Sequence, residues 1–272
     1  MDFQKNLPVP NISTNDVYYR RQLSFYMFNI HKLSDSKSFF YIYAEIYGKK
    51  GGDEVCSLLW DFIFNHLDLQ VKELKIFCDS CAGQNKNYAV FRMLHYIVHY
   101  TKRLDKITMF FPIRGHSYLE CDRNMDLINQ KSVVETPSEW NEIIEHSRSK
   151  PTPFRVISCE NQEIFKSWTK FLSPLYIKSC HFKTRPVRQL SIVSHHPRMM
   201  LHRQTVNGLN EESIVTKPKR KQISLPEGCF HLPELAYCGL LPLNKAKFDD
   251  IQHLKKFCSV KSQAYFDALP HA

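Results

Sequence analysis

The chain has 272 residues, of which 43% are hydrophobic and 13% aromatic, and this content excludes a disordered protein because it is enough to build a substantial core. The formal charge of +10 and the pI near 9.1 favour a polyanionic partner, with nucleic acid first and an anionic membrane surface second. Nine cysteines without a disulfide framework, and no apolar run of about 18 residues, predict an intracellular protein without a signal peptide or membrane segment.

The first quarter of the chain carries two strand signals and then a helix signal. Asp2 stands at the very start, so we expect a first strand that lacks its upstream half, followed by a proline-containing loop over residues 7–15. Residues 23–33 and 39–46 are rich in Phe, Tyr and Ile and flank a polar turn, which predicts an antiparallel hairpin. Residues 53–67 carry apolar side chains at helical spacing and predict a helix.

Asp79 lies at a predicted junction between a strand and a helix. Residues 74–77 form a short apolar run that predicts a buried strand, and residues 87–100 have an apolar face at helical spacing. A polar turn at residues 83–85 separates them. In an α/β sheet, ligands collect beyond the carboxyl ends of the strands, which makes Asp79 a candidate functional residue. An aspartate that only caps the turn explains the same pattern, and both interpretations stay open.

The order of the elements predicts the fold class. Residues 106–115 indicate another strand, and a helix with Asp122 near its beginning follows it. Three strands, then a helix, a strand, a helix, a strand and a helix, is the order of the ribonuclease H fold, in which the first and fourth strands are neighbours. We predict an α/β protein with a ribonuclease H-like mixed sheet flanked by helices in residues 1–134, an accessory α/β segment in residues 135–222 and a tail in residues 223–272.

Weaker signals continue through the second half of the chain. They predict helices at residues 139–147 and 162–172 and strands at residues 154–159 and 189–195. In the tail, residues 245–257 have the spacing of an amphipathic helix. These elements together are sufficient for a small accessory subdomain.

Three motifs in this order resemble a known family. DFQKNLP at the start, DSCAGQNKN after the predicted strand and RGHSYLECDR further on are similar to a transposase-derived domain of unknown function that occurs in many copies in animal genomes. The resemblance covers Asp2 to about Asn129 and implies a ribonuclease H-like core of the DDE type, with Asp2, Asp79 and Asp122 at the acidic positions. It implies descent from a DNA transposase and does not imply that activity is kept. The chain departs from the family after CDR, where Asn129 stands at a place that could hold a carboxylate.

The chemistry of this fold explains why three acids are needed. Phosphodiester transfer uses two divalent ions about 3.5–4 Å apart, and Mg²⁺ or Mn²⁺ prefers oxygen ligands. The resemblance therefore implies that Asp2, Asp79 and Asp122 bind such ions as catalytic residues. His116 precedes Asp122 by six residues and is the candidate that orients a carboxylate or the scissile phosphate; a histidine that only hydrogen-bonds the end of a strand is the alternative.

Basic residues supply the candidate nucleic-acid contacts. Arg114 and Arg123 flank the third motif and have the chemistry to hold phosphate oxygens. Lys219, Arg220 and Lys221 form a short basic cluster of the kind that directs nuclear import or contacts phosphates, although a solvated loop has the same composition. We predict a nuclear, DNA-binding protein from these residues.

Two other constellations compete with the acidic one. Cys78 and Cys81 form a CxxC pair, which suits a redox pair or half of a zinc site, but no second pair at zinc spacing exists. His95 and His99 are four residues apart on a predicted helix, yet Tyr96 stands where a metalloprotease motif requires glutamate, so we expect core or boundary histidines. Neither GxxxxGK[ST] nor GxGxxG occurs, and no nucleotide cofactor is expected.

The sequence thus leads to two hypotheses. The first is a transposase-derived nucleic-acid-binding protein that cuts or joins DNA with two metal ions held by an aspartate triad. The second is a catalytically silent DNA-binding or scaffold protein, in which the fold and the basic surface are kept. Metal-dependent cleavage of DNA separates them.

Overall fold

The computed structural model describes residues 1–113, 119–129, 133–205, 207–218 and 231–272 and divides the chain into two compact units. Unit 1 consists of Met1–Lys49, Tyr118–Glu163 and Tyr237–Ala272, and unit 2 consists of Lys50–Ser117 and Ile164–Ala236. Each unit is built from stretches that are far apart in the sequence. The predicted boundaries at residues 134 and 222, in contrast, divide the chain into consecutive pieces.

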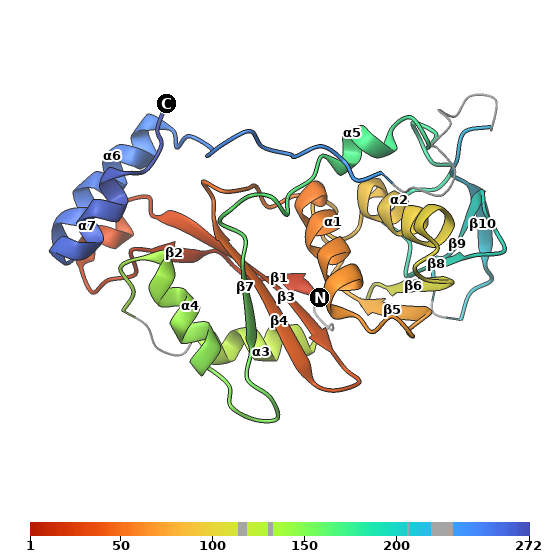
Figure 1. Cartoon of the computed structure of the whole chain (residues 1–272), viewed down its shortest axis with the longest axis horizontal. Coiled ribbons are helices and arrows are strands. Elements are labelled where there is room, and N and C mark those ends of the chain that lie inside the picture. The colour runs from red at the N-terminus through yellow and green to blue at the C-terminus, as the bar shows by residue number, and fades with distance from the viewer. Residues whose placement is uncertain (114–118, 130–132, 206, 219–230) are drawn as a thin grey trace. The chain divides into compact units, whose positions relative to one another are not determined.

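A five-stranded mixed sheet organises unit 1 (Figure 1). Its strands are β1 (Asp2–Phe3), β2 (Leu7–Val9), β3 (Leu23–Lys32), β4 (Lys37–Ala44) and β7 (Arg155–Ser158). The strand order is β1-β3-β4-β7, and β2 also pairs with β3; only the β4–β7 pair is parallel. The predicted hairpin is confirmed as β3 and β4. The expected loop at residues 7–15 is wrong in part, because β2 pairs with β3 and buries Leu7 and Val9.

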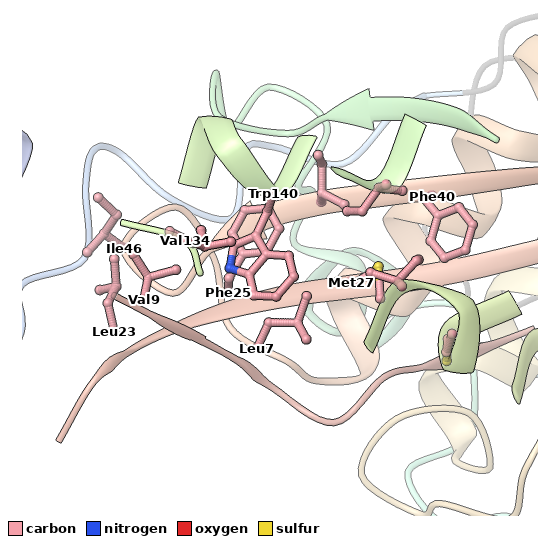
Figure 2. Packing of buried hydrophobic residues seen from close by; sticks show 14 of the residues in the cluster. Leu7, Val9, Leu23, Phe25, Met27, Phe40, Ile46, Val134 and Trp140 are labelled. Carbon is pink, nitrogen blue, oxygen red and sulfur yellow. The ribbon is translucent and has the colours of Figure 1, made fainter. Parts of the chain in front are cut away.

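Helices and the hairpin enclose the core of unit 1. The helices are α3 (Glu120–Asn129), α4 (Pro137–His146), α6 (Lys245–Leu254) and α7 (Val260–Asp267). Figure 2 shows Trp140 of α4 among apolar side chains of β2 and β3, such as Leu7 and Phe25. Its indole Nε1 donates to the Pro8 carbonyl at 3.3 Å, so the polar atom of this buried ring has a partner. Each fully buried side chain of this size contributes about 1.5–3 kcal/mol, which fixes α4 to the sheet.

Unit 2 has a second five-stranded mixed sheet with the order β10-β9-β8-β6-β5 (Figure 1). Its strands are β5 (Glu73–Phe77), β6 (Lys106–Phe110), β8 (Gln189–Val193), β9 (Met199–Arg203) and β10 (Glu211–Ile214). Its helices are α1 (Gly52–Asp61), α2 (Tyr88–Tyr96) and α5 (Trp168–Leu172). Only the β5–β6 pair is parallel. Two parallel strands therefore end at the same edge of this sheet.

The two long helices of unit 2 begin as the sequence predicts. The Asn87 side chain accepts from the Val90 N–H at 3.1 Å and caps α2. The Glu54 carboxylate accepts from the Gly51 N–H at 3.0 Å at the start of α1. Each helix continues into one π-helical turn, Phe62–His66 after α1 and Ile97–Thr101 after α2. Together these segments match the helices predicted at residues 53–67 and 87–100.

The prediction of a buried strand before Asp79 is wrong. Within unit 2, β5 is the last strand of its sheet and pairs with β6. Within β5 only Ile76 is buried, and Phe77 is 39% exposed although its ring stacks on Phe110 at 4.8 Å. The apolar run reflects cross-strand packing with the neighbouring strand rather than full burial.

The helix predicted at residues 162–172 is shorter in the structure. α5 begins only at Trp168, since Lys166 forms an isolated β-bridge with Leu235 and donates its N–H to Ser57 Oγ at 2.9 Å. These long-range hydrogen bonds hold the preceding residues extended and override the helical spacing. β9, β10 and α7 have no counterpart among the predicted elements. The strands at residues 154–159 and 189–195 and the helices at residues 139–147 and 245–257 are confirmed within a few residues.

The described residues form a mixed α/β structure with two mixed sheets and seven α-helices, where one sheet was expected. The element order from β1 through β3, β4, α1, β5, α2 and β6 to α3 agrees with the predicted order, apart from the additional β2. Pairing of the first with the fourth strand would join unit 1 to unit 2, and it stays a prediction. Within the described part of the chain, every helix is too short or too polar to cross a bilayer.

Candidate functional site

Asp79 lies two residues beyond the carboxyl end of β5 in unit 2 and is half-buried. Its Oδ1 atom accepts from the Cys81 N–H at 3.1 Å and from Asn85 Nδ2 at 2.7 Å. The Cys81 carbonyl in turn accepts from the N–H groups of Gln84, Asn85 and Lys86. The carboxylate thus organises the turn of the DSCAGQNKN motif. This is the capping role that the sequence left open, and the described contacts of Asp79 all engage Oδ1.

The two cysteines of the same motif are free thiols. Cys78 is buried, and its N–H donates to the Phe110 carbonyl at 3.2 Å, which extends the β5–β6 pairing by one residue. Cys81 is half-buried in the turn. The pair therefore borders Asp79 as part of the turn rather than as a disulfide.

Asp2 lies on β1 in unit 1, directly opposite Asn29 of β3. Residues that face each other in an antiparallel pair share one side of the sheet, so the Asp2 and Asn29 side chains leave the sheet on the same side. Asp2 Oδ1 accepts from the Phe3 N–H at 2.8 Å, and the residue is half-buried. The neighbouring pair Phe3 and Phe28 has ring centroids 4.8 Å apart, which ties this short strand to β3.

Asp122 lies in the first turn of α3, also in unit 1. Its Oδ2 accepts from the Leu119 N–H at 3.0 Å, which is the position of an acid that closes the start of a helix. The described contacts of Asp122 leave Oδ1 without a protein partner. Arg123 on the same helix forms an ion pair with Glu120 at 3.4 Å, and its side chain is 73% exposed.

A polar network connects α3 to the strand that faces Asp2. Asn124 Nδ2 donates to Asn29 Oδ1 at 3.3 Å, and Cys121 Sγ donates to the Asn29 carbonyl at 3.5 Å. Asn29 and Asn124 are 0% and 2% exposed, so the network is part of the interior. Unit 1 consequently brings the helix of Asp122 over the same residue that lies opposite Asp2.

The network extends to a guanidinium group. Arg148 donates to Asn124 Oδ1 at 3.1 Å and to the Ser36 carbonyl at 2.9 Å, and its guanidinium lies 4.3 Å from the ring centroid of Phe154. Burial lowers the pKa of His31, whose Nδ1 lies 2.7 Å from Ser38 Oγ in the same network. The sequence patterns did not indicate Asn29, Asn124 or Arg148 as site residues. The available signal was Asn29, a polar residue between the apolar Phe28 and Ile30.

The three acids do not all lie in one unit. Asp2 and Asp122 belong to unit 1 and Asp79 belongs to unit 2, so their convergence stays a prediction. Across the described residues, no three or more His, Cys, Asp or Glu side chains are grouped so that they could hold a metal ion. Five other predicted site residues lie outside the described residues: Arg114, His116, Lys219, Arg220 and Lys221.

His95 and His99 of unit 2 have ring centroids 4.1 Å apart; His95 is buried and His99 is half-buried. His95 Nδ1 lies 2.9 Å from the Tyr176 hydroxyl. Burial lowers the pKa of His99 to about 4 and the pKa of His95 well below its usual range, with the neighbouring His99 adding to the shift of His95. Both rings are therefore neutral near pH 7. His95 packs against the Tyr176 ring in the core, and His99 lies at its boundary, as expected for core or boundary histidines.

Residues 20–204 match the family model described as a domain of unknown function, DUF7869. The chain belongs to this family. The matched region of the DUF7869 chain contains Asp79 and Asp122, whereas Asp2 precedes it. No curated protein and no solved structure matches the chain.

Proposed function

We propose that this DUF7869 protein is a transposase-derived nucleic-acid-binding protein with a ribonuclease H-like core, and that Asp2, Asp79 and Asp122 form its metal site. The observation that carries the proposal is the position of Asp79 at the shared carboxyl edge of the parallel strands β5 and β6. The element order from β1 to α3 supports the ribonuclease H-like core. In unit 1, Asn29 lies opposite Asp2 and contacts the helix of Asp122.

The donor set suits a hard divalent cation. Asp79 Oδ2 and Asp122 Oδ1 are carboxylate oxygens that the described protein contacts leave available, and Mg²⁺ and Mn²⁺ prefer such ligands. Bound divalent ions would supply electrostatic stabilisation at a phosphodiester and activation of a water or hydroxyl. The aspartates themselves orient the cations, and the hydrogen bonds from Cys81 and Asn85 hold Asp79 in place for that role.

One observation favours the second hypothesis, a catalytically silent binding protein. Asp79 organises the turn of its motif and Asp122 caps α3, so both residues have structural roles that persist without catalysis. In that case the nucleic acid is bound and not cut. One experiment on the purified protein distinguishes the two hypotheses.

The experiment incubates purified protein with supercoiled plasmid in 5–10 mM Mg²⁺ or Mn²⁺, concentrations on the order of those that saturate weak carboxylate sites. We expect metal-dependent nicking that Asp79→Asn and Asp122→Asn reduce by at least about 100-fold, because removing one member of a catalytic set has effects of this order. Asp105→Asn in unit 2 and Asp126→Asn on α3 are the matched controls, since both residues are exposed. Equal nicking by all four variants rules out the aspartate site. Plasmid binding without nicking by the wild type supports the silent alternative.

We also propose a nuclear location, which rests on the basic cluster at Lys219, Arg220 and Lys221. Replacing all three by alanine in a fluorescent fusion is expected to shift the protein toward the cytoplasm. Nuclear accumulation that does not change would assign the cluster to DNA contact or to no function.

A further inference from the structure

Residues 164–210 of unit 2 carry positive charge without acidic residues. Between Ile164 and Asn210 the chain has eight lysines and arginines and no aspartate or glutamate. Residues 178–188, which we call the basic loop, connect α5 to β8 and contain Lys178, Lys183, Arg185 and Arg188. The first three are exposed and Arg188 is half-buried. Among the described residues no ion pair involves these four side chains, whereas Lys170 nearby in sequence pairs with Glu234 at 2.8 Å.

The motif of Asp79 and the start of α2 hold the basic loop in place. Lys86 Nζ donates to the Arg185 carbonyl at 2.9 Å, and the Tyr88 hydroxyl donates to the Phe182 carbonyl. Arg92 donates to the carbonyls of Ile177 and Lys178 at 2.7 and 3.2 Å. These three donors come from the residues that directly follow the turn of Asp79. The loop is therefore fastened along its length rather than only at its ends.

The basic loop lies at the same edge of the sheet as Asp79. The Arg188 carbonyl accepts from the Phe111 N–H at 2.9 Å, and its guanidinium donates to the Pro112 carbonyl at 3.4 Å, just beyond the carboxyl end of β6. Asp79 follows the carboxyl end of β5, the parallel neighbour of β6. In unit 2, the basic loop therefore lies at the same edge of the sheet as Asp79, and its four basic side chains form no described ion pair.

Lys86 shows that the positive charge is not neutralised by the protein. Its side chain is 2% exposed and its Nζ lies 4.8 Å from the ring centroid of Phe111. Burial and, to a lesser extent, the nearby Arg188 together lower the pKa of Lys86 to about 8, while Cys78 opposes the shift. The Lys86 ammonium thus lies near a second cation, and its described partners are the Arg185 carbonyl and the Phe111 ring rather than a carboxylate.

We propose that the basic loop binds the phosphodiester backbone of a nucleic acid and brings it to the carboxyl edge of β5 and β6. This inference rests on the proposed function and names the surface that performs its binding step. Guanidinium groups make paired hydrogen bonds with phosphate oxygens, and exposed lysines add charge without sequence preference. The loop therefore contributes sequence-independent, salt-dependent affinity.

The test measures the binding of a fluorescently labelled duplex DNA by anisotropy as the NaCl concentration is raised. The variant is Lys183→Gln/Arg185→Gln, and the control is Lys72→Gln/Lys75→Gln, which removes two exposed charges from the same unit. The logarithmic salt dependence of the wild type should be steep, and the loop variant should lose about 1.8 of its slope, at about 0.9 per phosphate contact. The control variant should keep the wild-type slope, and circular dichroism should show that both variants are folded.

The outcomes separate this inference from the proposed function. DNA binding by the wild type with equal slopes for the loop and control variants overturns the assignment of the loop and leaves the proposed function standing. A wild type that does not bind DNA at low salt overturns both. A loop variant that loses binding to phosphatidylserine vesicles and keeps its DNA slope also overturns the inference, because the loop would then bind a lipid surface.

Discussion

Trp168→Ala is expected to lower the free energy of unfolding by about 3–5 kcal/mol, the range for removing a buried aromatic side chain. Trp168 is 0% exposed, and its ring centroid lies 4.9 Å from that of Trp60 and 6.2 Å from that of Phe171. Its Nε1 donates to Ser57 Oγ at 3.2 Å, so the substitution also removes a buried hydrogen bond. The cavity would lie between α1 and α5, the helices that carry these residues and their neighbours.

Urea unfolding followed by far-UV circular dichroism measures this loss, since the signal does not depend on the tryptophan. Trp168→Phe should have a smaller effect because an aromatic ring still fills most of the site. Leu69→Ala is the control, since Leu69 is 71% exposed and its truncation should change stability by less than about 0.5 kcal/mol. A loss below about 1 kcal/mol for Trp168→Ala would contradict the packing of α5 described above.

Acid is expected to destabilise the protein between pH 6.5 and pH 4 through His95 and His99. The unfolded chain takes up protons at these histidines below about pH 6.5, whereas burial lowers the pKa of His99 in the folded state to about 4. The free energy of unfolding therefore falls as the pH is lowered through this window. For His99 alone the loss reaches about 3 kcal/mol at pH 4, at 1.36 kcal/mol per pKa unit.

A variant isolates this contribution from the carboxylates that also titrate in acid. His99→Phe removes the ionisable group, and His99 Nε2 has no hydrogen-bond partner in the described part of the structure that the substitution would break. The difference in stability between the wild type and His99→Phe should shift in favour of the variant as the pH falls from 6.5 to 4. A difference that stays constant over this range would show that His99 is accessible to protons in the folded state.

Elements defined by contacts close in the sequence were predictable. The β3–β4 hairpin has a polar turn between two aromatic-rich runs, and α2 starts at the capping residue Asn87 after a polar turn. In contrast, β2 is three residues long and contains Pro8, so only its pairing with β3 identifies it as a strand. The shortening of α5 depends on hydrogen bonds to residues more than 60 positions away.

The candidate site was predictable in its parts and not as a whole. The sequence identified Asp79 because its motif separates a strand from a helix, and the structure adds that Oδ1 holds the turn together. Sequence spacing could not reveal that Asn124 reaches Asn29 across 95 positions, since this contact depends on how α3 packs on β3. The assignment of Asp79 to one unit and of Asp2 and Asp122 to the other also depends on contacts between residues that are far apart in the sequence.

The measurement that tests the aspartate metal site most directly is the stabilisation of the protein by Mg²⁺ or Mn²⁺. With a dissociation constant of about 1 mM, 10 mM metal should raise the free energy of unfolding of the wild type by about 1.4 kcal/mol through mass action. Asp79→Asn and Asp122→Asn should each abolish this gain, and Asp105→Asn and Asp126→Asn should keep it. The same gain in the wild type and in Asp79→Asn would contradict the site.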